Sequence, residues 1–175
     1  HCRNNDFTSP DNYIHACYTD IPALFSERGL NTNTFPYLSA ANSMEYPPVT
    51  GLFAWAISFI TPNSSNVLYF DLNILFLIMM YFISALILKA LAPKYLYLFL
   101  ASPAVIASLF INWDLIAVAS ALLTVYFFEK KKYEESAIAL GISIATKFFP
   151  IVMLLPIAII FYRRKQLKQL SRYLF

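Results

Sequence analysis

The chain has 175 residues, of which 59% are hydrophobic, 17% aromatic and only 13% charged, and its mean hydropathy is +0.57. This apolar share lies well above that of an ordinary soluble domain. The formal net charge of +3 is small and by itself says nothing about nucleic acid. Because membrane topology accounts for the basic residues, we expect no nucleic-acid partner. The composition predicts an all-α, multi-spanning helical membrane protein that is embedded in the lipid bilayer.

Residues 1–48 are polar and lack the basic, apolar and small-residue regions of a signal peptide. The chain opens on His1 and turns apolar again at its last residues, so we expect an internal fragment of a longer protein. A segment of this length is too long for an idle connection between spans and predicts a functional extracytoplasmic loop. Its two cysteines, Cys2 and Cys17, could form a disulfide in an oxidising compartment; two free thiols, or a partner elsewhere, are equally open.

Residues 49–62 form a short apolar stretch that is too short for a full span. Both of its flanks are expected outside, which predicts a re-entrant or interfacial helix. Tyr46, Pro47 and Pro48 would start this helix, because proline is tolerated in a first helical turn and biases the preceding residue towards extended structure.

Four further apolar segments follow, and each is long enough, or almost, to cross a bilayer. The expected transmembrane helices are 67–88, 95–111, 112–128 and a hairpin over 133–162 that turns near Lys147. The hairpin arms are short for full spans, and Pro150 and Pro156 fit an irregular course. Residues 163–175 predict a cytoplasmic basic loop.

Basic residues on short loops set the orientation, because they are retained on the cytoplasmic side. They cluster in three loops, at Lys89 and Lys94, at 130–132, and at 163–172. With these loops inside, the outer face collects most of the acidic residues: Asp6, Asp11, Asp20, Glu27, Glu45, Asp71 and Asp114. The charge pattern therefore predicts an extracytoplasmic site in an integral, multi-pass membrane protein.

Asp71, Asp114 and Lys147 are ionisable groups expected near the same outer membrane boundary. Such groups cost roughly 2.5–3.5 kcal/mol each on insertion scales. A shared level on separate helices favours a common polar cavity, and the alternative is that the two acids only pair with Lys147 as a structural contact. Asp20, in a Thr-Asp-Ile triplet of the N-terminal loop, is a further candidate because of its place in that long segment.

Four short motifs occur in order along the chain: YTDIPALFSERGL, EYPPVTG, NWDLIAV and ATKFFPIVMLLP. In this order they resemble the first luminal loop and following spans of GT-C superfamily glycosyltransferases that use polyprenyl-phosphate sugars, with bacterial family 87 membrane proteins as the nearest likeness. They are also similar to the mannosyltransferase that adds the first mannose of glycosylphosphatidylinositol anchors. One departure is clear: Pro22 replaces the second acid of the family's Asp-x-Asp pair, which argues against a paired-carboxylate or metal site.

The resemblance implies a hexosyl or mannosyl transfer from a polyprenyl-phosphate sugar to a glycan or glycolipid acceptor, with inversion, in a bacterial plasma membrane. The sequence contains no metal-ligand spacing or glycine-rich phosphate loop, so no cofactor is expected. Asp20 would take the place of the catalytic loop aspartate and act as the general base. Lys147, with Arg28 as a weaker candidate, would face the departing phosphate. The other expected substrate-binding residues are Asn112, Asp114, Glu45 and Tyr46, although aromatic residues at this level also form the interfacial belt.

Two other classes of protein stay open. A transporter or flippase of lipid-linked saccharides would use Asp71, Asp114 and Lys147 as a gated polar path. Transporters usually have polar groups near the bilayer midplane and inverted repeats, whereas the polar groups of this sequence are expected at one face and no repeat is apparent. A non-catalytic membrane scaffold would tolerate changes at Asp20.

Overall fold

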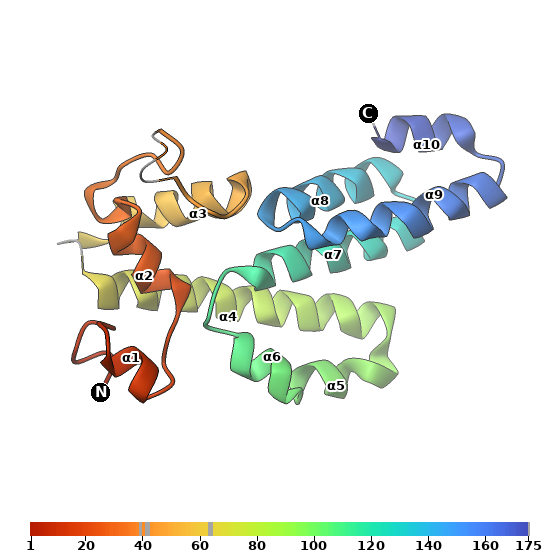
Figure 1. The fold of residues 1–175 in the computed structure, drawn as a ribbon. Helices are drawn as coiled ribbons and strands as arrows, with labels where there is room; N and C mark the ends of the chain where they lie inside the picture. The colour runs from red at the N-terminus through yellow and green to blue at the C-terminus, as the bar shows by residue number, and fades with distance from the viewer. Residues whose placement is uncertain (39, 41–42, 63–64, 175) are drawn as a thin grey trace.

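The computed structural model describes residues 1–38, 40, 43–62 and 65–174, and every regular element among them is helical (Figure 1). The expected all-α class is therefore confirmed for this part of the chain. In chain order the elements are α1 (Asp11–Ile14), α2 (Asp20–Glu27), η1 (Leu30–Thr32), α3 (Pro48–Phe59), α4 (Asn66–Leu91), η4 (Pro93–Tyr95), α5 (Leu96–Leu100), α6 (Pro103–Ser108), α7 (Asp114–Glu129), α8 (Tyr133–Thr146), η5 (Phe149–Met153), α9 (Leu154–Arg163) and α10 (Leu167–Leu174).

The N-terminal segment is more structured than a loop, since it contains α1, α2 and η1. Cys2 and Cys17 form a disulfide, with their Cα atoms 6.6 Å apart. The disulfide links the first turn of the chain, at residues 1–7, to the end of the segment that contains α1. Helix α2 packs on α4 through the stacked rings of Phe25 and Tyr69, whose centroids lie 4.0 Å apart. Residues 39, 41–42 and 175 of the two expected loops lie outside the described residues.

Helix α4 is the long axis of the fold and has 26 residues with a mean hydropathy of 2.4 in its most apolar window. At 1.5 Å per residue it is about 39 Å long, more than the hydrocarbon core of a bilayer. Ser65 caps it by accepting the N–H of Leu68 at 3.2 Å. Among the described residues it is the one helix long and apolar enough to span a membrane.

The segment expected as a single span over 95–111 is not one helix. It folds as η4, α5 and α6, with a break at Ala101 and Ser102. Pro103 explains the break, because proline has no N–H to donate and disfavours helical geometry at the residue before it. Ser102 is extended instead and accepts the N–H of Val105 as the cap of α6. This segment runs back along α4 (Figure 1).

Helices α7 and α8 make the most extensive helix pair in the described fold. Small hydroxyl residues join them: Ser143 Oγ donates to the carbonyl of Ala117 at 2.7 Å, and Ser136 Oγ to that of Thr124 at 2.8 Å. Contacts of this kind are typical of closely packed membrane helices. The expected hairpin over 133–162 turns at Lys147, which is extended between α8 and η5.

The two ends of the molecule differ in character. Helices α4, α7 and α9 end, and α8 begins, at the same end of the bundle (Figure 1), so the three basic clusters gather there. The other end carries the N-terminal segment, which buries Ile21, Phe25 and Leu30 against α4 and the start of α7. A second apolar cluster, with Phe128, Leu140, Ile157, Phe161 and Tyr173, holds α7 to α10 together near the basic end.

Candidate functional site

Asp20 is the first residue of α2, and the start of that helix is fixed by the segment before α7. Thr19 caps α2 by accepting the N–H of Ile21 at 3.3 Å, and its own hydroxyl donates to the carbonyl of Phe110 at 2.7 Å. The Asp20 N–H donates to the carbonyl of Ile111 at 2.8 Å. A carboxylate at a helix N-terminus is stabilised by the helix dipole. The Thr-Asp-Ile triplet thus places the Asp20 side chain at a fixed point beside the segment before α7.

Tyr46 contacts two groups of opposite charge, the Asp20 carboxylate and the Lys147 ammonium. Its hydroxyl donates to Asp20 Oδ2 at 2.5 Å, and the Lys147 ammonium lies 5.4 Å from the centre of its ring. The ring also meets Trp113 edge-on, with the centroids 5.6 Å apart. Tyr46 therefore links a carboxylate and a cation that lie 127 residues apart in sequence.

The Tyr46 backbone is held in turn by Tyr37, whose hydroxyl donates to the carbonyls of Tyr46 and Pro47 at 2.9 and 3.0 Å. Tyr37 reaches them by lying against Gly51 in the first turns of α3, where a Cβ would overlap the tyrosine ring. Burial raises the pKa of Tyr37, so its hydroxyl remains a donor over the neutral range.

Lys147 forms an ion pair with Asp114, the first residue of α7. Asn112 Oδ1 accepts the N–H of Asp114 at 3.0 Å and so shapes the start of α7. Between them in sequence, Trp113 is almost fully buried and donates its indole N–H to Asn73 Oδ1 of α4 at 2.7 Å. The Asn-Trp-Asp motif therefore fixes α7 to α4 and directs one carboxylate towards Lys147.

Arg28 forms an ion pair with Glu45, and the Arg28 Nε lies 3.2 Å from Glu45 Oε2. This pair joins the end of α2 to the residue before Tyr46. Both side chains keep solvent contact, so the pair adds little to stability.

A cavity of about 660 Å³ opens between these groups. Its volume is in the range of small-molecule sites. The lining residues are Tyr18, Asp20, Leu24, Glu27, Arg28, Glu45, Tyr46, Pro47, Lys147, Phe148 and Phe149. Five of the residues expected from sequence thus share one cavity: Asp20, Arg28, Glu45, Tyr46 and Lys147. Asn112 and Asp114 stand beside it, through the ion pair of Asp114 with Lys147.

Asp71 does not belong to this arrangement. It forms an ion pair with Arg3, and it is not among the described residues that line the cavity. The expectation of one cavity shared by Asp71, Asp114 and Lys147 is therefore wrong for Asp71. The reason is helical phase: Asp71 lies on α4 two residues from Asn73, so when Asn73 faces Trp113, Asp71 points to another side of the helix.

Sequence reasoning gave no role to Glu27, Asn73 or Phe149. Asn73 could have been found as an amide within an apolar span, since a buried polar group in such a helix needs a partner. Glu27 carries no signal of its own, because an exposed acid at the end of a short helix is common. Phe149 faces the cavity only because the chain breaks at Lys147.

The tyrosines of the cavity have perturbed acidities. Partial burial, reinforced by the Asp20 carboxylate, raises the pKa of Tyr18 to about 12. The same two causes, in the same order, raise the pKa of Tyr46 well above its usual range. Both hydroxyls therefore stay protonated and can donate to an acceptor at neutral pH.

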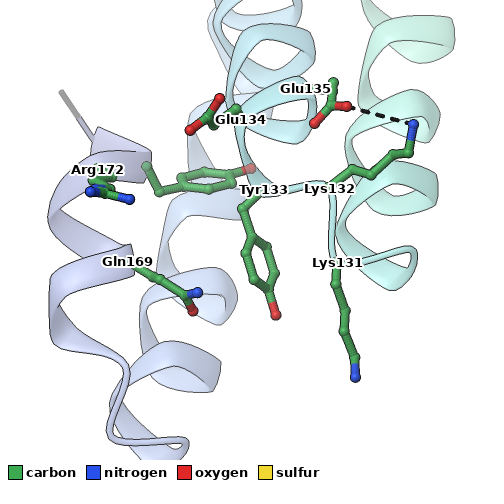
Figure 2. A pocket seen from close by; sticks show the side chains of 8 residues that line it. Lys131, Lys132, Tyr133, Glu134, Glu135, Gln169 and Arg172 are labelled. Carbon is green, nitrogen blue, oxygen red and sulfur yellow. Dashed lines mark ion pairs between the residues drawn. The ribbon is translucent and has the colours of Figure 1, made fainter.

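A second cavity, of about 340 Å³, lies near the basic end, between the start of α8 and α10. Gln169 and Arg172 of α10 face Tyr133 and Glu134 across it (Figure 2). Lys132 pairs with Glu135 at 3.6 Å at one side. This second cavity combines basic and acidic side chains. Part of its lining comes from the two basic segments expected on the cytoplasmic side, at 130–132 and 163–175, and the rest from the start of the expected hairpin.

Together the fold and the first cavity define a helical protein with an apolar long axis and a charged, aromatic-lined site at one end. Residues 107–174 match a family model described as Mannosyltransferase (PIG-M). The match supports, at a coarse level, the resemblance to GT-C-type mannosyltransferases and glycosyltransferase activity in general. It covers less than half of the chain, and it includes Asn112, Asp114 and Lys147 but not Asp20. No curated protein and no solved structure matches the chain.

Proposed function

We propose that this chain forms part of a membrane glycosyltransferase that moves a hexosyl group, most simply mannosyl, from a polyprenyl-phosphate donor on the extracytoplasmic face. The observation that carries the proposal is the meeting of Asp20, Tyr46 and Lys147 at one cavity. The reaction needs a base for the acceptor hydroxyl and a cation for the departing phosphate, and the cavity presents both.

In the proposed step the Asp20 carboxylate takes the proton of an acceptor hydroxyl as that oxygen attacks the anomeric carbon. The bond between the anomeric carbon and the phosphate oxygen breaks, and the electron pair leaves with the polyprenyl phosphate. Lys147 stabilises the charge that grows on this phosphate, and Arg28 lies in the same cavity as a second cation. A single displacement inverts the anomeric centre, so a β-linked donor gives an α-linked product.

The surroundings of the cavity suit a lipid-linked donor. Phe148 and Phe149 are both more than half exposed and follow Lys147 directly. They give the cavity an apolar side on which the first prenyl units can lie while the phosphate faces Lys147. Exposed apolar side chains along α4 support a surrounding bilayer. In this proposal the chain crosses the membrane more than once, and the cavity faces the side opposite the basic loops.

The test is sugar transfer by membranes that contain the protein, supplied with radiolabelled polyprenyl-phosphate mannose and endogenous acceptors. We expect wild-type membranes to transfer label and Asp20→Asn membranes, at matched expression, to lose transfer by at least about a hundredfold, as expected for removal of a general base. Asp6→Asn is the matched control, because it makes the same change outside the cavity. Transfer retained by Asp20→Asn would contradict the role of Asp20 as the base, whereas wild-type membranes that transfer no label would favour a transporter or a scaffold.

A further inference from the structure

The first turns of the chain contain a group of potential metal ligands that the proposed reaction does not use. The imidazoles of His1 and His15 stack with their centroids 4.6 Å apart, and the Asp11 carboxylate lies beside them. One ligand atom from each of the three residues lies within 4.8 Å of the other two. These are the only two histidines of the chain, so their meeting is a specific feature of this fold.

Covalent and helical constraints hold the three residues together. Asp11 and His15 are four residues apart and face the same side of α1, with the His15 N–H donating to the Asp11 carbonyl at 3.0 Å. The disulfide between Cys2 and Cys17 brings His1, the neighbour of Cys2, back to His15. The ligands therefore belong to a closed loop, which lowers the entropic cost of gathering them.

The Asp11 carboxylate is already oriented. Asn5 Nδ2 donates to its Oδ2 at 2.9 Å, which leaves Oδ1 towards His15 Nε2 at 3.2 Å. A hydrogen bond to the second oxygen of a ligand carboxylate is the usual support of a metal site. Arg3, a cation of the same segment, forms its ion pair with Asp71 rather than with Asp11.

We propose that His1, Asp11 and His15 bind a divalent transition-metal ion, for which Zn²⁺ is the natural probe. Two imidazole nitrogens and one carboxylate oxygen suit zinc, with a fourth position left for water. Tetrahedral ligands about 2.1 Å from zinc lie about 3.4 Å from one another, and Asp11 and His15 already meet this spacing. His1 is exposed, so its ring has room to turn its lone pair towards the other two. The bound ion would fasten the first turn to α1, at a site independent of Asp20.

The experiment is a titration of the whole protein with Zn²⁺ in detergent at about pH 7.5, without a polyhistidine tag, followed by calorimetry. We expect one zinc ion per chain, and binding at least about tenfold weaker in His15→Gln and Asp11→Asn, since even supporting residues contribute that much. Asn5→Ala is expected to weaken binding by roughly tenfold as well. Asp6→Asn, an acid of the same segment outside the cluster, is the matched control and binds like the wild type.

A second measurement needs no variant. The chain has two histidines, so a nitrogen-detected NMR spectrum contains two sets of imidazole signals. Both sets should shift together when one equivalent of Zn²⁺ is added. The proposal is overturned if wild-type protein takes up no zinc, if His15→Gln and Asp11→Asn bind it as well as the wild type, or if only one histidine responds.

Discussion

Tyr46 is the residue that connects the reacting groups of the proposed site. Its hydroxyl donates to one oxygen of Asp20, and its ring faces the Lys147 ammonium. The two contacts use different parts of the side chain, so they can be separated by mutation. The polar contact orients the base, and the ring contributes a cation–π attraction to the phosphate-facing cation.

Tyr46→Phe removes only the hydroxyl. A hydrogen bond to a charged group contributes about 1.5–3 kcal/mol, so we expect kcat to fall roughly 10- to 100-fold with little change in KM for the donor. Tyr46→Leu, which also removes the ring under Lys147, should in addition raise KM. The measurement is transfer rate against donor concentration for both variants. A Tyr46→Phe protein with wild-type kcat would show that Tyr46 does not position Asp20.

The raised pKa values of Tyr18 and Tyr46 give stability a pH dependence. An unfolded tyrosine ionises near pH 10, so above that pH the unfolded chain loses these protons before the folded chain does. The stabilisation is complete below about pH 10; the part due to Tyr18 is lost as the pH rises through about 12, and the part due to Tyr46 is lost at higher pH. We expect the unfolding midpoint in detergent to fall over this range, and to fall less steeply for Tyr46→Phe. Tyr162→Phe, at an exposed position, is the control and should follow the wild type; equal slopes in all three proteins would contradict the prediction.

At the scale of elements, the site depends on how α3 meets the N-terminal segment. Gly51 lets Tyr37 lie against the helix backbone, and Tyr37 in turn holds the carbonyls of Tyr46 and Pro47. Thr50, its neighbour, donates to the carbonyl of Thr146 at 2.7 Å, one residue before Lys147. Helix α3 therefore sets the positions of both Tyr46 and Lys147.

Gly51→Ala should destabilise the protein by about 1–3 kcal/mol, the usual cost of overpacking a filled site, and should lower transfer because Tyr37 can no longer hold Tyr46. Gly141→Ala is the matched control: a Cβ there meets nothing within 4 Å, so alanine in mid-helix should stabilise by roughly 0.5–1 kcal/mol. Both are measured by unfolding in detergent. Equal effects of the two substitutions would show that Tyr37 and Gly51 do not constrain each other.

The elements show where sequence patterns are sufficient and where they are not. Proline before an apolar run indicated the start of α3, since proline is restricted locally. The break at Ser102 before Pro103 follows from the same restriction, although the apolar run of 95–111 alone predicted one helix. Asp71 and Asn73 lie two residues apart on α4, and which of them faces α7 depended on helical phase and packing, which hydropathy does not contain.

At the scale of the molecule, the fold separates two kinds of surface. The basic clusters follow the ends of α4, α7 and α9, which lie at one end of the bundle (Figure 1). Asp20 and Lys147 line the first cavity, and Asp114, at the start of α7, pairs with Lys147. A bilayer between these ends would place the cavity outside and the second cavity of Figure 2 inside. This orientation is part of the proposed function, in which the cavity faces the side opposite the basic loops.

This orientation can be tested with single cysteines in a Cys2→Ser, Cys17→Ser background. Asn4→Cys lies in the N-terminal segment and Lys165→Cys in the basic segment after α9. A membrane-impermeant maleimide should label the first in intact cells and the second only after permeabilisation, because the basic segment is retained inside. Labelling is read as a gel shift. Labelling of both positions from the same side would overturn the proposed topology.

The sequence by itself determined the helical class, the apolar long helix and the residue types of the candidate site. These follow from composition, hydropathy and local proline and capping rules, which act within a few residues. Only the tertiary structure decided that Tyr46 joins Asp20 to Lys147, that Asp71 pairs with Arg3, and that the two histidines meet beside Asp11. Apart from the local pair of Asp11 and His15, these contacts join residues well separated in the chain and depend on how the segments pack, which no local pattern specifies.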